Sequence, residues 1–318
     1  MSEQTATPFL GLQEAGITTP HPVYQGKVRE VVDLDSRVLL VTTDRISAFD
    51  RILGAIPYKG EVLNRLACWW LDKASQMVPT HFIQRVGSRS MLVHKARVLP
   101  VEVIVRGYLT GSAWRDYQAG KPTSGLHFPP GMKKNQQFTQ PVITPSTKAE
   151  MGLHDEPVSS QEVVSRGLVS PEIWQQITDY AYELFAFGSR IAEAQGLILV
   201  DTKYEFGILP DGKVVVVDEI HTPDSSRYWF SQGYPEALEQ GRDPRSLDKE
   251  FLRSWLLERG FSGEGPAPAM PDELILEISK RYQDLYSLIT GEKFQTISKN
   301  PQSETADIMV IIGGKDQA

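Results

Sequence analysis

The sequence has little cysteine, because only Cys68 among its 318 residues carries a thiol. A single cysteine excludes an intrachain disulfide and any metal site built from several thiolates. Since Cys68 lies in the apolar stretch NRLACWWLD, we expect a buried structural thiol rather than a nucleophile. The six histidines also lack the His-x-x-x-His spacing of a zinc site. The sequence therefore supports neither a zinc centre nor a Ser-His-Asp triad.

Long hydrophobic runs and an excess of positive charge are missing as well. No apolar run approaches the roughly 18 residues that span a bilayer. The first residues, MSEQTATPFLGLQEAG, lack the features of a signal peptide. The net charge of -7 disfavours non-specific binding to nucleic acid or to a membrane surface, although it leaves room for a local basic pocket. We expect a cytoplasmic protein that binds neither nucleic acid nor membranes.

Motifs of several nucleotide-binding enzyme classes are absent. Gly26 and Lys27 do not have the spacing of a Walker A loop, and the strings HRD and DFG of protein kinases do not occur. A kinase is therefore a weaker alternative interpretation. A nucleotide-binding regulatory domain without catalytic activity is another, and such a domain would lack one of the acids or lysines that an active site needs.

Periodic hydrophobic patterns are present, and they predict a mixed fold. Strands are indicated over 23–34, 37–44 and 90–109, and a helix is indicated over 59–78. Residues 111–160 are rich in Gly, Pro, Lys and Thr and show little periodicity. This composition predicts a long loop that is either functional or disordered.

The second half of the chain begins with a strongly marked helix, with Ser170 as its N-cap and Gly196 as its terminator. A charged hairpin follows over 199–220, and later helices are indicated over 247–260 and 272–291. Antiparallel hairpins followed by helices favour an α+β fold over an alternating, doubly wound sheet.

The hairpin LVDTKYEFGILPDGKVVVVDEI carries its charges in an alternating pattern. Because residues two apart share a face of a strand, Asp201, Lys203 and Glu205 point one way. The intervening residues are mostly apolar and point the other way. We expect one face to pack on the core and the other to line a cleft or solvent. For any one of these charges, a solvated outer face is the alternative.

The turn sequence sets the register of this hairpin. Pro210 cannot supply a ladder N–H, so a type I turn with Gly212 as a left-handed bulge residue fits better than a two-residue turn. That register places Val217 opposite Glu205, so Asp218 lies one residue beyond the position opposite Glu205. Both acids can reach one ion only if the second strand bulges or bends near Asp218.

Two carboxylates that converge without a compensating pair of cations require a divalent ion. Oxygen ligands indicate Mg²⁺ or Mn²⁺. Mg²⁺ is typically held by one or two carboxylates together with substrate phosphates. Glu205 and Asp218 are therefore candidate metal ligands, and a site that grips phosphate is expected elsewhere in the chain.

Basic residues beside glycine or hydroxyl residues supply candidate anion sites. In YQGKVREVV, Gly26 lets the backbone approach a phosphate, and Lys27 and Arg29 alternate onto one face of the strand, although a Gly-Lys pair is more often simply a turn. In VEVIVRGYLTGSAW, Arg106 precedes a Gly-Ser turn, which suits a sugar phosphate, with a structural ion pair as the alternative. Lys148 stands in the flap-like segment TPSTKAEMGLHDEPVS, for which a solvated loop is the alternative.

Two further polar segments are open to two interpretations each. TTDRISAFDR, with Asp44 and Ser47, either lines a cleft or caps a helix. TPDSSR, with Asp224, Ser226 and Arg227, lies next to the acids and either serves the site or forms a cap or Asx-turn.

Taken together, these stretches resemble one family. GKVRE, TTDRISAFD, PVEVIVRGYLTGSAW, TPSTKAEMGLHDE, GLILVDTKYEFG and VDEIHTPDSSRYW occur in the order found in phosphoribosylaminoimidazole-succinocarboxamide synthases, the SAICAR synthetases. The resemblance implies a two-lobed α+β fold, with a small β-rich lobe like the N-lobe of kinases and a larger ATP-grasp-like lobe with C-terminal helices. It divides the chain into a lead-in (1–20), the β-rich lobe (21–113), the nucleotide- and substrate-binding lobe (114–295) and a tail (296–318).

The same resemblance implies a role for each candidate residue. The ATP-binding positions are Gly26, Lys27, Arg29, Val98, Leu99, Glu102 and Lys148, and the stretch Val98–Glu102 corresponds to the hinge that faces adenine. The positions for the imidazole ribonucleotide are Arg106, Ser112, Lys203, Ser226 and Arg227, together with Asp44 and Ser47. The metal-binding positions are Glu205 and Asp218, and the catalytic positions are Lys203, Asp201 and Asp224.

The implied activity is an ATP-dependent ligation in purine biosynthesis. The family joins the carboxylate of carboxyaminoimidazole ribonucleotide (CAIR) to L-aspartate and forms SAICAR, ADP and phosphate, and we expect an acyl phosphate on the way. The implied ligands are ATP with Mg²⁺ or Mn²⁺, CAIR and L-aspartate. The expected assembly is a monomer or a small homo-oligomer.

Overall fold

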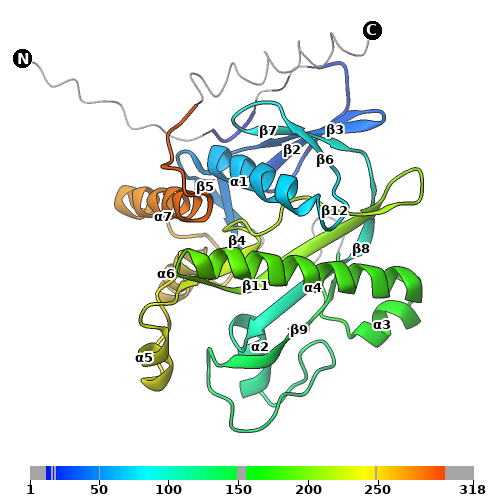
Figure 1. Cartoon of the computed structure of the whole chain (residues 1–318). Helices are drawn as coiled ribbons and strands as arrows, with labels where there is room; N and C mark the ends of the chain where they lie inside the picture. The colour runs from blue at the N-terminus through cyan, green and yellow to red at the C-terminus, as the bar shows by residue number, and fades with distance from the viewer. Residues whose placement is uncertain are drawn as a thin grey trace, which may run out of the picture. The chain divides into compact units, whose positions relative to one another are not determined.

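The structure is a computed structural model that describes residues 12–15, 17, 19–49, 51–148, 155–247 and 249–297 (Figure 1). Most of the predicted lead-in and tail lies outside these ranges. Residues 149–154 of the flap-like segment also lie outside them, whereas Lys148 is included.

The chain divides into two compact units. The first is formed by Met1–Leu66, Ile83–Val93 and Phe251–Ala318, and the second by Ala67–Phe82 and His94–Glu250. This division differs from the continuous one expected from the sequence, because residues from 251 onward group with the N-terminal part of the chain.

The first unit is built on a five-stranded sheet with the order β1-β2-β3-β7-β6. Its strands are β1 (Val23–Gln25), β2 (Arg29–Leu34), β3 (Arg37–Thr42), β7 (Ser90–His94) and β6 (Phe82–Arg85). The run predicted as one strand over 23–34 is a hairpin instead, because the chain turns at Gly26, whose N–H donates to the carbonyl of Arg29 at 2.7 Å. β4 (Arg45–Ala48) and β5 (Arg51–Ala55) form a separate two-stranded ribbon.

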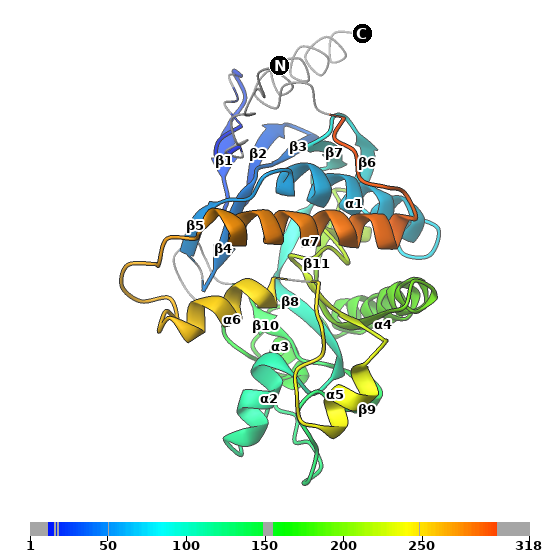
Figure 2. The same cartoon turned by 90° about the vertical axis from the view of Figure 1, so that its left-hand side faces the viewer.

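Two of the predicted helices lie side by side, α1 (Lys59–Ala74) and α7 (Asp272–Thr290) (Figure 2). The first turns of α1 are held to α7 because Arg65 donates to the hydroxyl of Tyr286 at 2.8 Å and places its guanidinium over that ring. Helix α7 ends where Gly291 adopts a φ of 75°, a left-handed conformation that favours glycine at this position.

The second unit centres on a six-stranded sheet in which β11 (Leu197–Ile208) is the central strand. β11 pairs with β8 (Arg97–Tyr108) along one edge, and with β12 (Val214–Val217) and β13 (Ser226–Phe230) along the other. β9 (Gln137–Ile143) and β10 (Ser146–Thr147) pair with β8. These pairings are all antiparallel, in agreement with the predicted α+β class.

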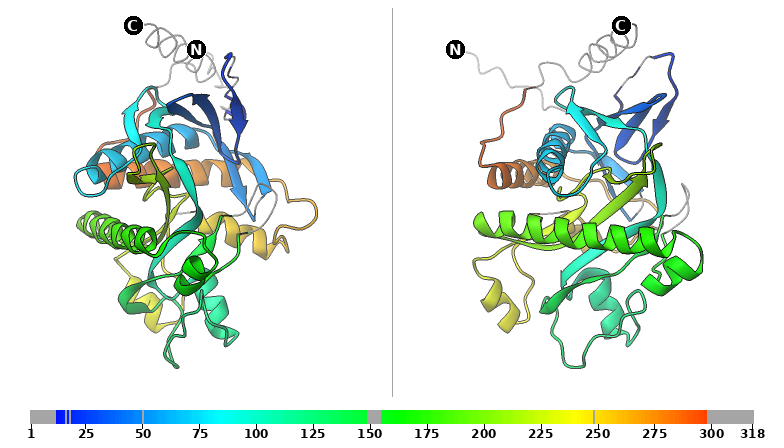
Figure 3. Two further views of the ribbon diagram at one scale, coloured as in Figure 1. Left: turned by 90° about the vertical axis from the view of Figure 1, so that its right-hand side faces the viewer. Right: turned by 45° about the vertical axis from the view of Figure 1, so that its right-hand side comes forward.

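Helix α4 (Pro171–Ala194) lies along the sheet formed by β8 and β11 (Figure 3). As predicted, the side chain of Ser170 caps it by accepting a hydrogen bond from the N–H of Ile173 at 3.3 Å. The ring of Phe185 in this helix packs against Gly107 of β8. A Cβ atom on residue 107 would lie only 3.3 Å from Cζ of Phe185. The residues that α4 buries are Trp174, Ile177, Ala181, Leu184, Phe185, Gly188 and Ala192.

The prediction of a long loop over 111–160 is wrong. This segment contains α2 (Gly111–Gln118), β9 and β10, and α3 (Ser160–Ser165) begins at its end. The elements are short and rest on a small cluster of Leu109, Ala113 and Phe138, so they produce no extended hydrophobic period.

Two short helices complete the structure, α5 (Tyr234–Glu239) and α6 (Glu250–Glu258). Cys68 is buried and forms no disulfide, in agreement with the expected structural thiol. None of the described helices combines the length and apolar character needed to cross a bilayer.

Candidate active site

The charges of β11 lie on one face of the sheet in the second unit. Asp201 and Glu205 are buried there, and Lys203 lies between them on the same face. The hydroxyl of Tyr204, on the opposite face, lies 2.6 Å from Nε2 of the buried His221. The expected division into a charged face and a core face is therefore confirmed.

The predicted register of the hairpin is also confirmed. Val217 lies directly opposite Glu205, and Gly212 adopts a φ of 88° as the left-handed turn residue. β12 ends at Val217, and Asp218 adopts a left-handed φ of 64°. The chain thus bends at Asp218. Such a bend is needed if Glu205 and Asp218 are to reach the same ion.

Asp201 lies between two arginines of the flanking strands, Arg106 and Arg227, which we call the arginine pair. Both are its direct cross-strand neighbours. Nη1 of Arg106 donates to Oδ2 of Asp201 at 3.1 Å, and Nη1 of Arg227 donates to the same oxygen at 2.5 Å. Arg106 also donates to the hydroxyl of Ser112 at 3.1 Å and to that of Thr144 at 2.8 Å. Four predicted site residues are thereby brought together.

The arginine pair carries an excess of positive charge. Burial lowers the pKa of the Arg106 guanidinium and Asp201 opposes that shift, but a guanidinium stays protonated in proteins. One carboxylate against two guanidinium groups leaves a net positive charge beside the first turn of α2. Gly111 leaves space for the guanidinium group of Arg227, because a Cβ atom on residue 111 would lie 2.7 Å from each terminal nitrogen of Arg227. Such a place suits an anionic group of a substrate.

A second group of charges, which we call the carboxylate–lysine cluster, consists of Glu102, Lys148, Lys203 and Glu205. Nζ of Lys203 donates to Oε1 of Glu102 at 2.5 Å and to Oε1 of Glu205 at 2.7 Å. Nζ of Lys148 donates to Oε2 of Glu205. The premise that no cations compensate Glu205 is therefore wrong. Lys148 lies 57 residues before Glu205, a separation that hides the pairing in the sequence.

These pairings favour the charged forms of Glu205 and Lys203, whereas burial disfavours that of Glu102. Burial raises the pKa of Glu205, but Lys203 and Lys148 more than offset this and bring it to about 2. Burial lowers the pKa of Lys203, yet Glu205 and Glu102 raise it above its usual value. Burial raises the pKa of Glu102, and Lys203 opposes that shift.

The residues of this cluster fit a divalent cation that shares its ligands with a substrate. Among the described residues, no three His, Cys, Asp or Glu side chains gather closely enough to hold a metal ion alone. Each carboxylate oxygen of Glu205, however, is met by an ammonium group, so its surroundings already accommodate positive charge. An oxygen-only donor set completed by phosphate oxygens is typical of Mg²⁺.

The segment 218–225 is tied together by its own side chains. The hydroxyl of Thr222 donates to Oε2 of Glu219 at 2.6 Å, and the N–H of Thr222 donates to Oγ of Ser225 at 3.2 Å. Oδ2 of Asp224 lies 3.8 Å from Nζ of Lys249, and only 6% of the Asp224 side chain is exposed. Asp224 thus lies on a loop that folds on itself, with an ion pair at its carboxylate.

Ser226 is not placed with the other predicted site residues. It pairs with Thr202 across the strands, and its hydroxyl donates to Oγ1 of Thr202 at 2.7 Å. Both side chains therefore belong to the face of the sheet opposite Asp201.

His221 is a buried residue of this loop that the sequence did not single out. Its backbone adopts a left-handed φ of 56°, and its ring fills a notch at Gly188 of α4, where a Cβ atom would lie 2.6 Å from Cε1. Nε2 pairs with the hydroxyl of Tyr204, and Nδ1 has no hydrogen-bond partner among the described residues. Burial lowers the pKa of His221 to about 3, so the imidazole is neutral.

In the first unit, the Gly26–Lys27 turn is held by Arg45, another residue that the sequence did not assign. Nη2 of Arg45 donates to the carbonyl of Gly26 at 3.0 Å, and Nε donates to that of Lys27 at 3.1 Å. Lys27 is exposed in the turn, whereas Arg29 begins β2 and is buried. The two side chains therefore do not alternate along one strand as predicted. Because the turn carbonyls point at Arg45, the N–H groups of the same trans peptides point away from it.

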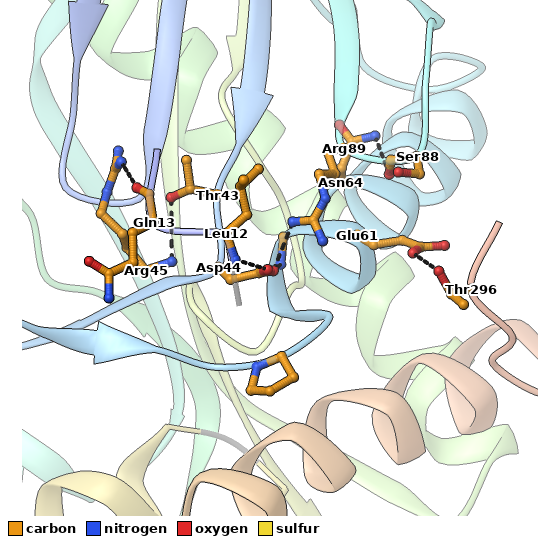
Figure 4. Close-up of polar contacts among 12 residues, drawn as sticks. Leu12, Gln13, Thr43, Asp44, Arg45, Glu61, Asn64, Ser88, Arg89 and Thr296 are labelled. Atoms are coloured by element: carbon orange, nitrogen blue, oxygen red, sulfur yellow. Dashed lines mark hydrogen bonds and ion pairs between the residues drawn. The ribbon is translucent and has the colours of Figure 1, made fainter. Parts of the chain in front are cut away.

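Ser47 belongs to β4, whereas Asp44 lies in the bend that precedes β4 and accepts a hydrogen bond from the N–H of Gly60 in the first turn of α1, as a helix cap does. Asp44 is fully buried, and its carboxylate bonds to both Leu12 and Arg89 (Figure 4). Its Oδ1 accepts from Arg89 Nη1 and from the N–H of Gly60, both at 2.8 Å, and its Oδ2 accepts from the N–H of Leu12 at 2.6 Å. Such contacts give Asp44 a structural function in the first unit.

The expected adenine hinge lies in β8, where the register of the pairing with β11 shifts between Glu102 and Val98. Val98 is exposed and Leu99 is buried, and Glu102 lies directly opposite Glu205. The side chain of Glu102 therefore belongs to the carboxylate–lysine cluster, whereas an adenine contact at the hinge would use backbone groups.

Comparisons with known proteins agree with one another. A family model described as SAICAR synthetase matches residues 22–268. A phosphoribosylaminoimidazole-succinocarboxamide synthase of Legionella pneumophila (strain Paris) is 47% identical over 277 residues, which cover 85% of this chain and 88% of the relative. The synthase of Bacteroides thetaiotaomicron is 47% identical over 277 residues, covering 86% of this chain and 88% of the relative.

Solved structures give the same result. A SAICAR synthase from Saccharomyces cerevisiae complexed with SAICAR has a TM-score of 0.76 and 34% identity, and the match covers 87% of this chain and 97% of that one. A SAICAR synthetase in complex with ADP has a TM-score of 0.67 and 25% identity, and the match covers 86% of this chain and 100% of that one.

The buried neutral His221 predicts a loss of stability in acid. The unfolded histidine binds a proton below about pH 6.5, whereas the folded one does so only below a pKa of about 3. Acid therefore favours the unfolded state across this range, and His221 contributes a slope of up to about 1.4 kcal/mol per pH unit. Urea unfolding between pH 4 and pH 6 should show a shallower pH dependence for His221→Asn, since Asn tolerates a left-handed backbone. Parallel curves for the two proteins would contradict the assignment.

Proposed function

Because the chain belongs to the SAICAR synthetase family, we propose that it joins the carboxylate of CAIR to the amine of L-aspartate at the expense of ATP, giving SAICAR, ADP and phosphate. The observation that carries the proposal is the charged face of β11. On this face, Asp201, which holds the arginine pair, lies two residues along β11 from Lys203 and four residues from Glu205.

The chemistry explains why such a face is needed. A carboxylate is a poor electrophile, so its oxygen first attacks the γ-phosphorus of ATP, and the bond to the leaving ADP breaks. The aspartate amine then attacks the carbon of the acyl phosphate, a C–N bond forms and phosphate leaves. Catalysis of this kind depends on positioning and on neutralising negative charge.

We assign the imidazole ribonucleotide to the arginine pair, with Ser112 and Lys203. Asp201 orients both arginines, because its Oδ2 accepts a hydrogen bond from each. Lys203 would then meet the part of the substrate that lies closer to Glu205. Ser226 acts from the opposite face of the sheet by fixing β13 to β11 through Thr202.

Mg²⁺, or Mn²⁺, would be held by Glu205 and Asp218 together with phosphate oxygens of ATP. When bound, it would offset the charge that develops on the transferred phosphoryl group. Lys148 contacts Glu205 in the structure, and it would remain beside the phosphates as a donor.

The remaining ATP-binding assignments rest on the family resemblance. The Gly26–Lys27 turn and Arg29 are proposed to bind the phosphates of ATP. The backbone of Val98–Glu102 is proposed to face adenine. For Asp44, the contacts within the first unit support a structural function in place of substrate binding, whereas Ser47 stays a proposed position for the imidazole ribonucleotide.

For the proton of the aspartate ammonium group, Asp201 and Asp224 are the two candidates. Asp201 is shared between two arginines, and Oδ2 of Asp224 lies 3.8 Å from Nζ of Lys249. The expected setting is the cytoplasm, with a monomer or a small homo-oligomer as the working form.

The proposed reaction can be tested by following phosphate release with ATP and Mg²⁺ present. A ligase should release phosphate only when CAIR and L-aspartate are both added, because the acyl phosphate is consumed by the amine. Turnover of ATP with CAIR alone, at the same rate, would indicate a kinase. The absence of turnover with all substrates would indicate a binding domain.

Removing Arg106 should affect one substrate selectively. Arg106→Ala deletes one of the two guanidinium groups of the arginine pair, so we expect the KM for CAIR to rise by about tenfold to a hundredfold, in line with 1.5–3 kcal/mol for a charged hydrogen bond. The KM for ATP should change little. Arg190→Ala, an exposed arginine on α4, serves as the control. Equal effects on both substrates would count against the assignment.

A further inference from the structure

Glu102 and Glu205 form an acidic pair across two neighbouring strands. They are direct partners in the pairing of β8 with β11, so their side chains leave the same face of the sheet. Both carboxylates are nearly buried, with 10% of the Glu102 side chain and 8% of the Glu205 side chain exposed. Two like charges placed opposite each other destabilise a sheet unless a cation lies between them.

Lys203 is that cation. Its Nζ lies 2.5 Å from Oε1 of Glu102 and 2.7 Å from Oε1 of Glu205, so it bridges the two strands. The second oxygen of Glu102 accepts a hydrogen bond from the hydroxyl of Ser146 in β10, at 3.4 Å. Glu102 is thus fixed from the strand on its other side and presents one oxygen to Lys203.

The two acids of this pair differ in what the proposed reaction requires of them. Glu205 is assigned to a divalent cation, and an ion bound there competes with the ammonium groups of Lys148 and Lys203. Glu102 is two strands from β12 and forms hydrogen bonds with Lys203 and Ser146, so it continues to hold Lys203 when Glu205 changes partner.

We propose that Glu102 is a positioning residue for the reaction: it keeps the ammonium group of Lys203 on the charged face of β11, where Lys203 meets the imidazole ribonucleotide. The inference rests on the proposed function, because it takes from there the role of Lys203. It gives the side chain of Glu102 a task separate from the adenine contact expected of the hinge backbone.

A flexible lysine binds its ligand better when it is held in place beforehand. Lysine carries a point charge on a long flexible stem, so ordering it during binding lowers the affinity for the ligand. A carboxylate that orders the stem in advance removes part of this cost. Replacing Glu102 should therefore weaken ribonucleotide binding through Lys203 and leave nucleotide binding nearly unchanged.

The test is a double-mutant cycle read out by calorimetric titration with SAICAR, in the absence of metal and nucleotide. Glu102→Gln keeps the size and removes the charge, and we expect it to weaken SAICAR binding by about fivefold to tenfold, within the usual range for coupled neighbours. Lys203→Met should weaken binding at least as much. The double variant should bind no more weakly than Lys203→Met alone, because Glu102 acts through Lys203.

Three further measurements complete the design. Glu102→Asp keeps the charge on a shorter stem, so it should recover part of the affinity, and it also tests the proposal if Glu102→Gln fails to fold. Glu183→Gln makes the same exchange at an exposed position of α4 and should bind like the wild type. Binding of ADP, measured for every variant, should stay within about twofold of the wild type if only Lys203 is affected.

The outcomes separate this inference from the proposed function. If Lys203→Met binds SAICAR as tightly as the wild type, the assignment of Lys203 to the ribonucleotide fails, and the inference fails with it. If Lys203→Met weakens binding while Glu102→Gln does not, only the inference is overturned. Additive losses in the double variant, or an equal loss of ADP affinity in Glu102→Gln, would also overturn it.

Discussion

The structure of the candidate site depends on one constraint, the two-residue period of the central strand β11. One face of this strand is committed to the core, where Tyr204 meets His221 and helix α4 covers the sheet. The other face must then carry Asp201, Lys203 and Glu205 in a row, at a spacing of roughly 6.6 Å between neighbours on that face. A slip of one residue would bury these charges in the core, so the packing of α4 also holds the site in register.

Burial of so many charges is tolerated because each one is paired within the second unit. Asp201 is shared by the arginine pair, and Glu205 is shared by two lysines. An isolated buried charge would destabilise the fold, whereas these pairs are satisfied before any substrate arrives. The charged groups are consequently held in place in advance, which is the form of electrostatic catalysis that does not require rearrangement during the reaction. Substrates and cations then exchange with partners that are already present.

Local patterns in the sequence predicted the parts of this arrangement that depend on local rules. Pro210 and Gly212 decided the register of the hairpin, and Ser170 decided where α4 begins. The pairings themselves could not be predicted, because they join residues far apart in the chain. Arg106 and Asp201 are 95 residues apart, and Glu102 and Lys203 are 101 apart. The family resemblance named most of these residues, but only the register of β8 against β11 shows why Glu102 faces Lys203.

The most direct test of the charged face is a crystal structure with ADP and Mn²⁺, in which anomalous scattering locates the metal ion. If this face is the metal–nucleotide site, the ion will lie within bonding distance of a carboxylate oxygen of Glu205, Asp218 will join it, and Nζ of Lys148 will have left Glu205. An ion bound away from Glu205, with both lysines still on that carboxylate, would contradict the central claim.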